Sequence, residues 1–129
     1  MERSLTQRSA HHSDHHTMYT SKTIQYTANT LTHAVMAYIV STGGYAWRAS
    51  SVGIYDKKVG GWRTAPKKGV SDVIACRDGT LCCIEIKIGK DKLSPEQEGF
   101  LKNIAHVGGL TFVAKDFESF KEFWDKSFP

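Results

Sequence analysis

The sequence predicts a single α/β domain in which helices flank a mixed four-stranded sheet, with the element order α-β-β-β-α-β-α. Two strand-like runs, 70–77 and 80–88, are separated only by Asp78-Gly79, a pair typical of tight hairpins. A helical pattern then precedes an apolar run at 110–114, and a helical crossover of this kind makes the two strands that it joins parallel. The length of 129 residues suits one compact domain.

The first elements follow from hydrophobic spacing. Apolar residues that begin with Leu31 and Val35 recur at helical intervals, which predicts a helix over 30–42 that ends at a Gly-Gly pair. A short strand is expected at 45–49. The Gly-, Ser- and Lys-rich segment 50–69 is interpreted as a loop or an irregular hairpin.

The predicted hairpin places two acidic residues opposite each other. If 78–79 is a two-residue turn, Arg77 pairs with Thr80. Counting five residues outward along each strand then sets Asp72 opposite Glu85 on the same face of the sheet. Residues on the other face of the second strand are apolar, so that face is expected to meet the core.

A helix is expected to start at Ser94, which can cap it, with Pro95 in the first turn. Gln97 is in register with the apolar side of this helix, so it can either face the sheet or close a capping box with Ser94. We weigh these two roles evenly and expect them to compete for the one side chain. The strand at 110–114 is apolar throughout and is expected to be buried on both faces, followed by an aromatic terminal helix capped by Asp116.

Two opposed carboxylates in an otherwise apolar strand need compensation. Asp72 and Glu85 repel each other, and burying either is costly unless a positive charge is near. Lys87 shares their face and can supply one charge, whereas a divalent cation such as Mg²⁺ or Mn²⁺ would supply two. The alternative is a surface salt bridge on an open sheet face. We favour the metal site, because charged clusters in buried strands more often mark functional sites.

Composition limits the class of protein. The chain has 17 Lys and Arg against 13 Asp and Glu, a net charge of +4, which suits a polyanionic partner without requiring one. We find no membrane-length apolar run and no secretory leader, and three closely spaced cysteines do not suggest a disulfide framework. We expect a cytoplasmic protein with reduced, buried thiols.

The N-terminal residues 1–22 differ from the rest, which we assign to one domain over 23–129. They are polar and rich in histidine, so they are expected to form a disordered arm. His11, His12, His15 and His16 could chelate a metal if the arm were helical, but a plain polar tail is the preferred interpretation.

Several motifs together resemble the PD-(D/E)XK nuclease superfamily, and more closely its VRR-NUC branch. They are Gly-Val-Ser-Asp at 69–72, Glu-Ile-Lys at 85–87, Lys-Asp-Lys-Leu-Ser-Pro-Glu-Gln at 90–97 and Gly-Gly-Leu-Thr-Phe-Val-Ala at 108–114. The resemblance covers about residues 28 to 120 and agrees with the element order above. It implies a restriction-endonuclease-like fold.

The resemblance also implies roles for individual residues. Asp72 and Glu85 would bind Mg²⁺ or Mn²⁺, and the backbone carbonyl of Ile86 would be a further ligand of the metal. Lys87 would be the catalytic lysine, and Gln97 matches a glutamine beside the site in this branch. The implied activity is hydrolysis of DNA phosphodiester bonds, selective for DNA structure in the manner of Holliday-junction resolvases, by a C2 homodimer with no membrane partner.

This chain departs from the family in one respect. Many relatives carry a further acidic ligand on the first helix, but the sequence has no Asp or Glu between Thr23 and Tyr55. Asn29 or His33 could take its place, although His33 is more simply interpreted as a surface histidine. The number of metals is therefore left open.

Basic residues flank the proposed site in the sequence and are candidates for contacts with DNA phosphates rather than bases. They are Arg48, Arg63, Lys67, Lys68, Lys90 and Lys92, with Lys57 and Lys58 in the same loop region. Trp62 could stack on an unpaired base. Solvated lysines kept for solubility are the alternative.

Three functions are compatible with these features. The leading hypothesis is a metal-dependent DNA endonuclease. The second is a weak or inactive DNA-binding module on the same fold, which the missing acid of the first helix favours. The third is an interaction subunit of a larger assembly, which leaves the grouping of Asp72, Glu85 and Lys87 unexplained.

Overall fold

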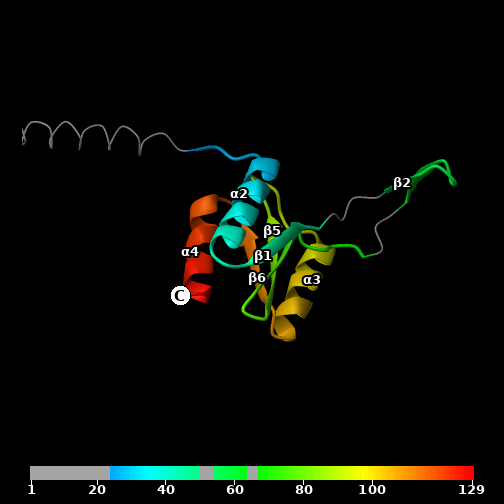
Figure 1. Ribbon diagram of the computed structural model, residues 1–129. Helices are drawn as coiled ribbons and strands as arrows, with labels where there is room; N and C mark the ends of the chain where they lie inside the picture. Colours follow the sequence, from blue (N-terminus) through cyan, green and yellow to red (C-terminus); the bar gives the residue numbers. More distant parts are fainter. Residues whose placement is uncertain (1–23, 50–53, 64–66) are drawn as a thin grey trace, which may run out of the picture.

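The computed structural model describes residues 24–49, 54–63 and 67–129 (Figure 1). The predicted histidine-rich arm at 1–22 lies outside these residues. The described part of the chain forms three helices and two sheets. In order, its elements are α2 (Ala28–Ser41), β1 (Tyr45–Arg48), β2 (Ile54–Asp56), β3 (Gly61–Arg63), β4 (Val73–Arg77), β5 (Thr80–Ile86), α3 (Pro95–His106), β6 (Leu110–Ala114) and α4 (Phe117–Ser127).

The main sheet has four strands in the order β1-β4-β5-β6. β1 pairs antiparallel with β4, β4 antiparallel with β5, and β5 parallel with β6, which confirms the predicted mixed sheet. β2 and β3 form a separate two-stranded ribbon. Of the two interpretations left open for this segment, the short hairpin is the one observed.

The hairpin between β4 and β5 has the predicted register. Asp78 has φ 51° and Gly79 has φ 76°, the two positive values that a type I′ turn requires. Arg77 pairs with Thr80, and the ladder runs without a break to Val73 opposite Ile84. An aspartate at the first turn position tolerates the left-handed region better than most residues, and a glycine at the second adopts it freely.

Each helix begins at a capping side chain. Thr27 and Thr30 form a capping box at the start of α2, which therefore begins two residues before the expected position 30. Ser94 and Gln97 form a second box at α3, where Pro95 occupies the first turn. The Asp116 carboxylate accepts a hydrogen bond from the Ser119 amide at α4, as predicted.

The sheet separates two layers of helix. α2 and α4 pack together on one face, and α3 lies on the other face beside β6 (Figure 1). Apolar side chains of α2, α4 and the facing sides of the strands form the main core: Leu31, Val35, Ile39, Val73, Ala75, Cys82, Ile84, Ile86, Ala114, Phe120 and Trp124. The aromatic side of α4 is therefore used within the domain.

Two expectations about burial were wrong. β6 is an edge strand, so solvent reaches it and only Ala114 is fully buried, whereas Leu110 to Val113 are half-buried. Cys76 is exposed, although Cys82 and Cys83 are buried as expected, because Cys76 lies on a part of the sheet face that none of the three described helices covers. All three thiols are free.

Among the helices that the structure describes, none combines the length and the apolar character needed to cross a membrane.

Candidate active site

The acidic pair lies at the end of the central hairpin. Asp72 immediately precedes β4, one residue beyond the last ladder pair, Val73 with Ile84. Continuing the same register brings Asp72 to the level of Glu85, as the turn predicted. Alternation along the strands puts both side chains on the α3 face, opposite the main core.

Asp72 is held by backbone contacts on both sides. Its Oδ2 accepts a hydrogen bond of 2.8 Å from the amide of Ile86. Its own carbonyl accepts a hydrogen bond of 2.9 Å from the amide of Ala49, which follows β1. The carboxylate is therefore fixed between two strands, next to the backbone of Ile86. That the Ile86 carbonyl serves as a third ligand stays a prediction.

Glu85 is the most unusual side chain of the domain. It is only 1% exposed, and its Oε1 accepts a hydrogen bond of 3.1 Å from Nε2 of Gln97. Its second oxygen, Oε2, is buried without a hydrogen-bond partner. An acceptor left in this state costs on the order of 1–3 kcal/mol, more if it is charged. When Glu85 is ionised, this oxygen is therefore left unsatisfied beside Asp72, which calls for a functional explanation.

Burial also changes the acidity of Glu85. Its pKa is raised from 4.5 to about 8, first because burial penalises the charged form, second because the protonated carboxyl can share a hydrogen bond with the Asp72 side chain, and third because the Asp72 charge repels a second negative charge. Lys87 acts in the opposite direction and lowers the pKa. Without a further cation, Glu85 holds a proton at neutral pH.

Gln97 performs both of the roles that we expected to compete. Its Oε1 accepts from the Ser94 amide at 2.9 Å and closes the capping box, while its Nε2 donates to Glu85. The expectation of competition was wrong, because a side-chain amide has an acceptor at one end and a donor at the other. The start of α3 is thereby joined to the acidic pair.

The loop before Asp72 passes very close to α3. Gly69 has φ +81°, and a Cβ added there would lie 2.4 Å from the backbone carbon and oxygen of Glu96. Only glycine fits this contact without a shift of the loop or the helix. Beside it is a recess of about 290 Å³ lined by Lys68, Gly69, Ser94, Glu96 and Gln97.

Lys87 comes directly after β5 and is half-buried. Its amide donates to the Ala114 carbonyl at 2.9 Å, which extends the parallel pairing with β6 by one step. It stands two residues beyond Glu85, so its side chain leaves the same face of the sheet. The predicted trio is thus brought together in one place.

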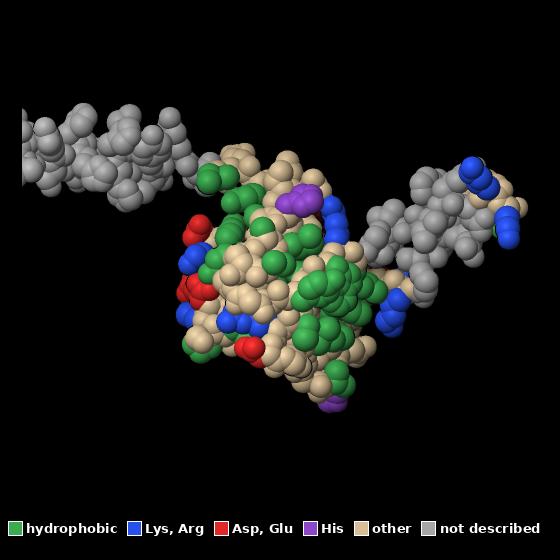
Figure 2. Space-filling view, viewed as in Figure 1, with side chains coloured by type: hydrophobic (Ala, Val, Ile, Leu, Met, Phe, Trp, Pro, Cys, Tyr) green, Lys and Arg blue, Asp and Glu red, His purple; other side chains and the backbone are tan. Residues whose placement is uncertain are grey.

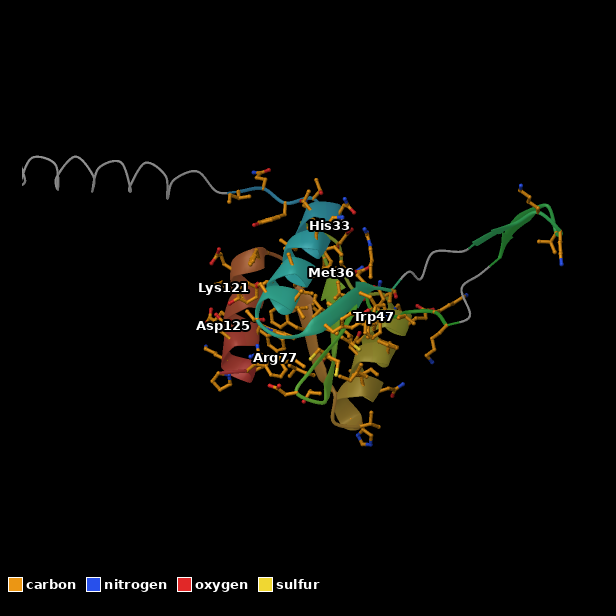
Figure 3. The ribbon with its side chains drawn as sticks, in the orientation of Figure 1. His33, Met36, Trp47, Arg77, Lys121 and Asp125 are labelled. Atoms are coloured by element: carbon orange, nitrogen blue, oxygen red, sulfur yellow. The ribbon has the colours of Figure 1, made fainter. Side chains whose placement is uncertain are left out.

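The first helix supplies no further acid. Asn29 lies in its first turn, and its Oδ1 accepts a hydrogen bond of 2.7 Å from Nη1 of Arg48. His33 is exposed on α2 (Figures 2 and 3). Within 24–49, 54–63 and 67–129, no group of three or more His, Cys, Asp or Glu side chains is arranged to hold a metal. Protein carboxylates at the site are therefore limited to two among the described residues.

The candidate DNA contacts differ in position. Lys67, Lys68, Lys90 and Lys92 are all exposed. Arg48 is also exposed, but its guanidinium is engaged by Asn29. The Arg63 side chain lies outside what the structure describes, as does that of Trp62, while Lys57 and Lys58 are exposed in the turn of the β2–β3 ribbon.

Sequence reasoning missed three residues around the site. Gly69 was identified only as part of a motif, although its close approach to the backbone of α3 leaves room only for glycine. Tyr45 and Trp47 were assigned to β1 without a role, and both are exposed on the α3 side of the sheet. Their alternation was visible in the sequence, but nothing there indicated which face would be uncovered.

A search of protein-family models, curated proteins and solved structures finds no match to this chain.

Proposed function

We propose that the chain is a divalent-metal-dependent nuclease that hydrolyses DNA phosphodiester bonds on a restriction-endonuclease-like fold of the PD-(D/E)XK, VRR-NUC-like type. The observation that carries the proposal is the buried, unpartnered Oε2 of Glu85 beside Asp72. Two carboxylates this close repel each other unless one of them is protonated, and a bound divalent cation can take the place of that proton.

The residues present fit Mg²⁺ or Mn²⁺. Asp72 and Glu85 supply carboxylate oxygens, and the backbone beside Asp72 offers the Ile86 carbonyl as a third ligand. A cation bound there neutralises the pair, polarises a phosphodiester and makes water more acidic. Two carboxylates are few, so substrate oxygens and water would have to supply the remaining ligands, as is usual for Mg²⁺.

The chain's own residues divide the remaining work. The Lys87 ammonium lies on the same face and can orient the attacking water or stabilise negative charge that develops on the phosphate. Gln97 fixes the rotamer of Glu85 through the hydrogen bond to Oε1. Asp72 is fixed by the Ile86 amide, so the ligands are positioned before any substrate arrives.

Cleavage of labelled branched, duplex and single-stranded DNA, each with Mg²⁺, Mn²⁺ or EDTA, tests the activity. We expect cleavage that requires the metal and falls by about 10²-fold or more in Lys87→Ala. Lys102→Ala is the matched control, because Lys102 is exposed and paired only with Glu98 on the outer side of α3. No cleavage of any substrate, or equal activity of both variants, would sink the proposal. Preference for branched DNA and a homodimer in solution are expected from the same resemblance, and a cytoplasmic location is expected from the reduced cysteines.

The second candidate is a DNA-binding module without activity, which the missing third acid favours. It predicts DNA binding that weakens with salt but is indifferent to metal. Under this alternative, Glu85→Gln would bind DNA like the wild type both in Mn²⁺ and in EDTA. A difference in DNA binding between the wild type and Glu85→Gln that appears only in Mn²⁺ would favour the nuclease over this alternative.

A further inference from the structure

The β1 side of the sheet face that carries the acidic pair is open to solvent. α3 packs beside β6, at the far edge from β1. On β1, Tyr45 is 69% exposed and Trp47 is 44% exposed. Their ring centroids are 5.8 Å apart with the planes tilted by 45°, so the two rings stand side by side as one strip. Figure 2 shows hydrophobic side chains gathered where Figure 3 labels Trp47.

This aromatic strip, Tyr45 and Trp47, begins beside the acidic pair. Trp47 pairs with Ile74, which is two residues after Asp72 on the same face. Trp47 and Asp72 are therefore diagonal neighbours on two adjacent strands, a separation of roughly 7–8 Å that is somewhat less between Cβ atoms. Tyr45 pairs with Cys76, one step further from the acids. The strip thus leads away from the carboxylates in a straight line along β1.

The strip is too small for a stable interface between two copies of the chain. A fully buried aromatic side chain contributes about 150–250 Å², whereas a stable interface needs about 800 Å² from each partner. Among the described residues, the apolar surface of this face is extended by Leu81, which pairs with Cys76 and is 41% exposed, and by Cys76 and the half-buried Ile74. An extended ligand one strand wide fits these dimensions better.

The chemistry favours nucleic acid as that ligand. Exposed rings offer flat faces on which bases stack whatever their sequence. No acidic side chain lies among the strip residues or their ladder partners, Ile74 and Cys76. Cationic side chains stand at the other end, where Lys87 follows the acidic pair and Lys68 lines the recess. Phosphates would therefore meet the cations and metal ligands, and bases would meet the rings.

We infer that unpaired bases next to the scissile phosphate stack on Trp47 and Tyr45, so that the substrate is DNA with a single-stranded segment at the cut. Base pairs in the interior of a duplex are stacked on both faces and cannot use the strip, so a duplex offers only its terminal pairs. The inference rests on the proposed nuclease function for the location of the cut, but the stacking can be measured without cleavage.

Fluorescence anisotropy in EDTA, with labelled oligothymidine and with a blunt duplex, tests the stacking. Trp47→Ala should weaken oligothymidine binding by roughly 5- to 150-fold, the range measured for loss of one stacked ring. Trp47→Phe should retain most of the affinity, and duplex binding should change little in either variant. Val40→Ala, which removes an exposed apolar side chain on α2, is the matched control. Thermal melts of each variant check that the fold is intact.

Three results would overturn the inference. They are unchanged oligothymidine affinity in folded Trp47→Ala, equal losses for oligothymidine and duplex, and a wild-type dimer that becomes a monomer on this substitution. The last would assign the strip to a second copy of the chain. Metal-dependent cleavage with unchanged Trp47→Ala binding refutes the stacking alone. Ring-dependent binding with no cleavage in Mg²⁺ or Mn²⁺ refutes the nuclease alone.

Discussion

The buried acid predicts a stability that depends on pH in an unusual direction. Glu85 has a pKa of about 8 in the folded protein against 4.5 as its ordinary value, chiefly because of burial. The folded state therefore binds a proton more tightly than the unfolded state. This contribution to stability is fully present below about pH 4.5 and is lost as the pH rises through about 8.

The magnitude follows from the shift. About 1.4 kcal/mol per pH unit, over the interval from 4.5 to about 8, amounts to roughly 5 kcal/mol in the metal-free protein. That is a large part of the total stability of a domain, which is commonly 5–15 kcal/mol. Glu85→Gln keeps the shape and the oxygen that accepts from Gln97, but it cannot ionise.

Urea unfolding in EDTA between about pH 5 and about pH 8 measures the effect. We expect the wild type to lose several kcal/mol relative to Glu85→Gln across this interval. Glu98→Gln is the matched control, because Glu98 is an exposed glutamate on α3 that lies outside the acidic pair. Free-energy curves for the wild type and Glu85→Gln that run parallel over the whole interval would refute the reasoning.

Bound metal should offset the stability that the folded protein loses as the pH rises. At about 100 times its dissociation constant, a bound ion stabilises the folded state by about 2.7 kcal/mol. We expect Mn²⁺ to stabilise the wild type at about pH 8, where Glu85 ionises more readily than at lower pH, and to have no such effect on Glu85→Gln. Equal stabilisation of both proteins would mean that the ion binds elsewhere.

Two further predictions concern the contact between the loop and α3. Gly69→Ala should destabilise by more than Gly79→Ala, because both glycines have positive φ but only the first would place a Cβ 2.4 Å from the helix backbone. Gly79→Ala should lower the free energy of unfolding by only about 1–2 kcal/mol, the cost of a left-handed backbone for a residue with a Cβ. Equal losses for the two variants in urea unfolding would count against the contact between Gly69 and α3. Ser94→Ala should lose only the helix cap, which contributes about 0.5–2 kcal/mol to the free energy of unfolding. Gln97→Ala should lose more, because it also leaves a buried carboxyl oxygen of Glu85 unpaired. A smaller loss for Gln97→Ala in thermal melts would contradict the dual role.

The parts of the fold that were predictable depend on local chemistry. The Asp-Gly turn specifies its own backbone angles, and the ladder then follows residue by residue to the level of Asp72 and Glu85. The parallel pairing of β5 with β6 follows from the helix between them. The cap at Asp116 needed only its sequence neighbours.

The parts that were not predictable depend on what lies across the sheet. An apolar strand such as β6 is consistent with a central or an edge position, and only the assembled sheet shows which. The same holds for Cys76 and Trp47, whose exposure is decided by how far α3 extends over the face. The double role of Gln97 requires the distance between a helix start and a strand 12 residues earlier in the sequence.

The two-residue turn has a consequence for how the protein tolerates change. Side chains alternate along β5, so inserting or deleting one residue between Arg77 and Thr80 would invert the phase of the whole strand. Ile84 would then face α3, and Glu85 would face the apolar core. Substitutions in the turn should therefore have mild effects. Inserting or deleting one residue there should abolish the site, although every residue that forms the site is unchanged. The length of a remote loop is thus as strict a determinant of this acidic pair as the identity of the acids.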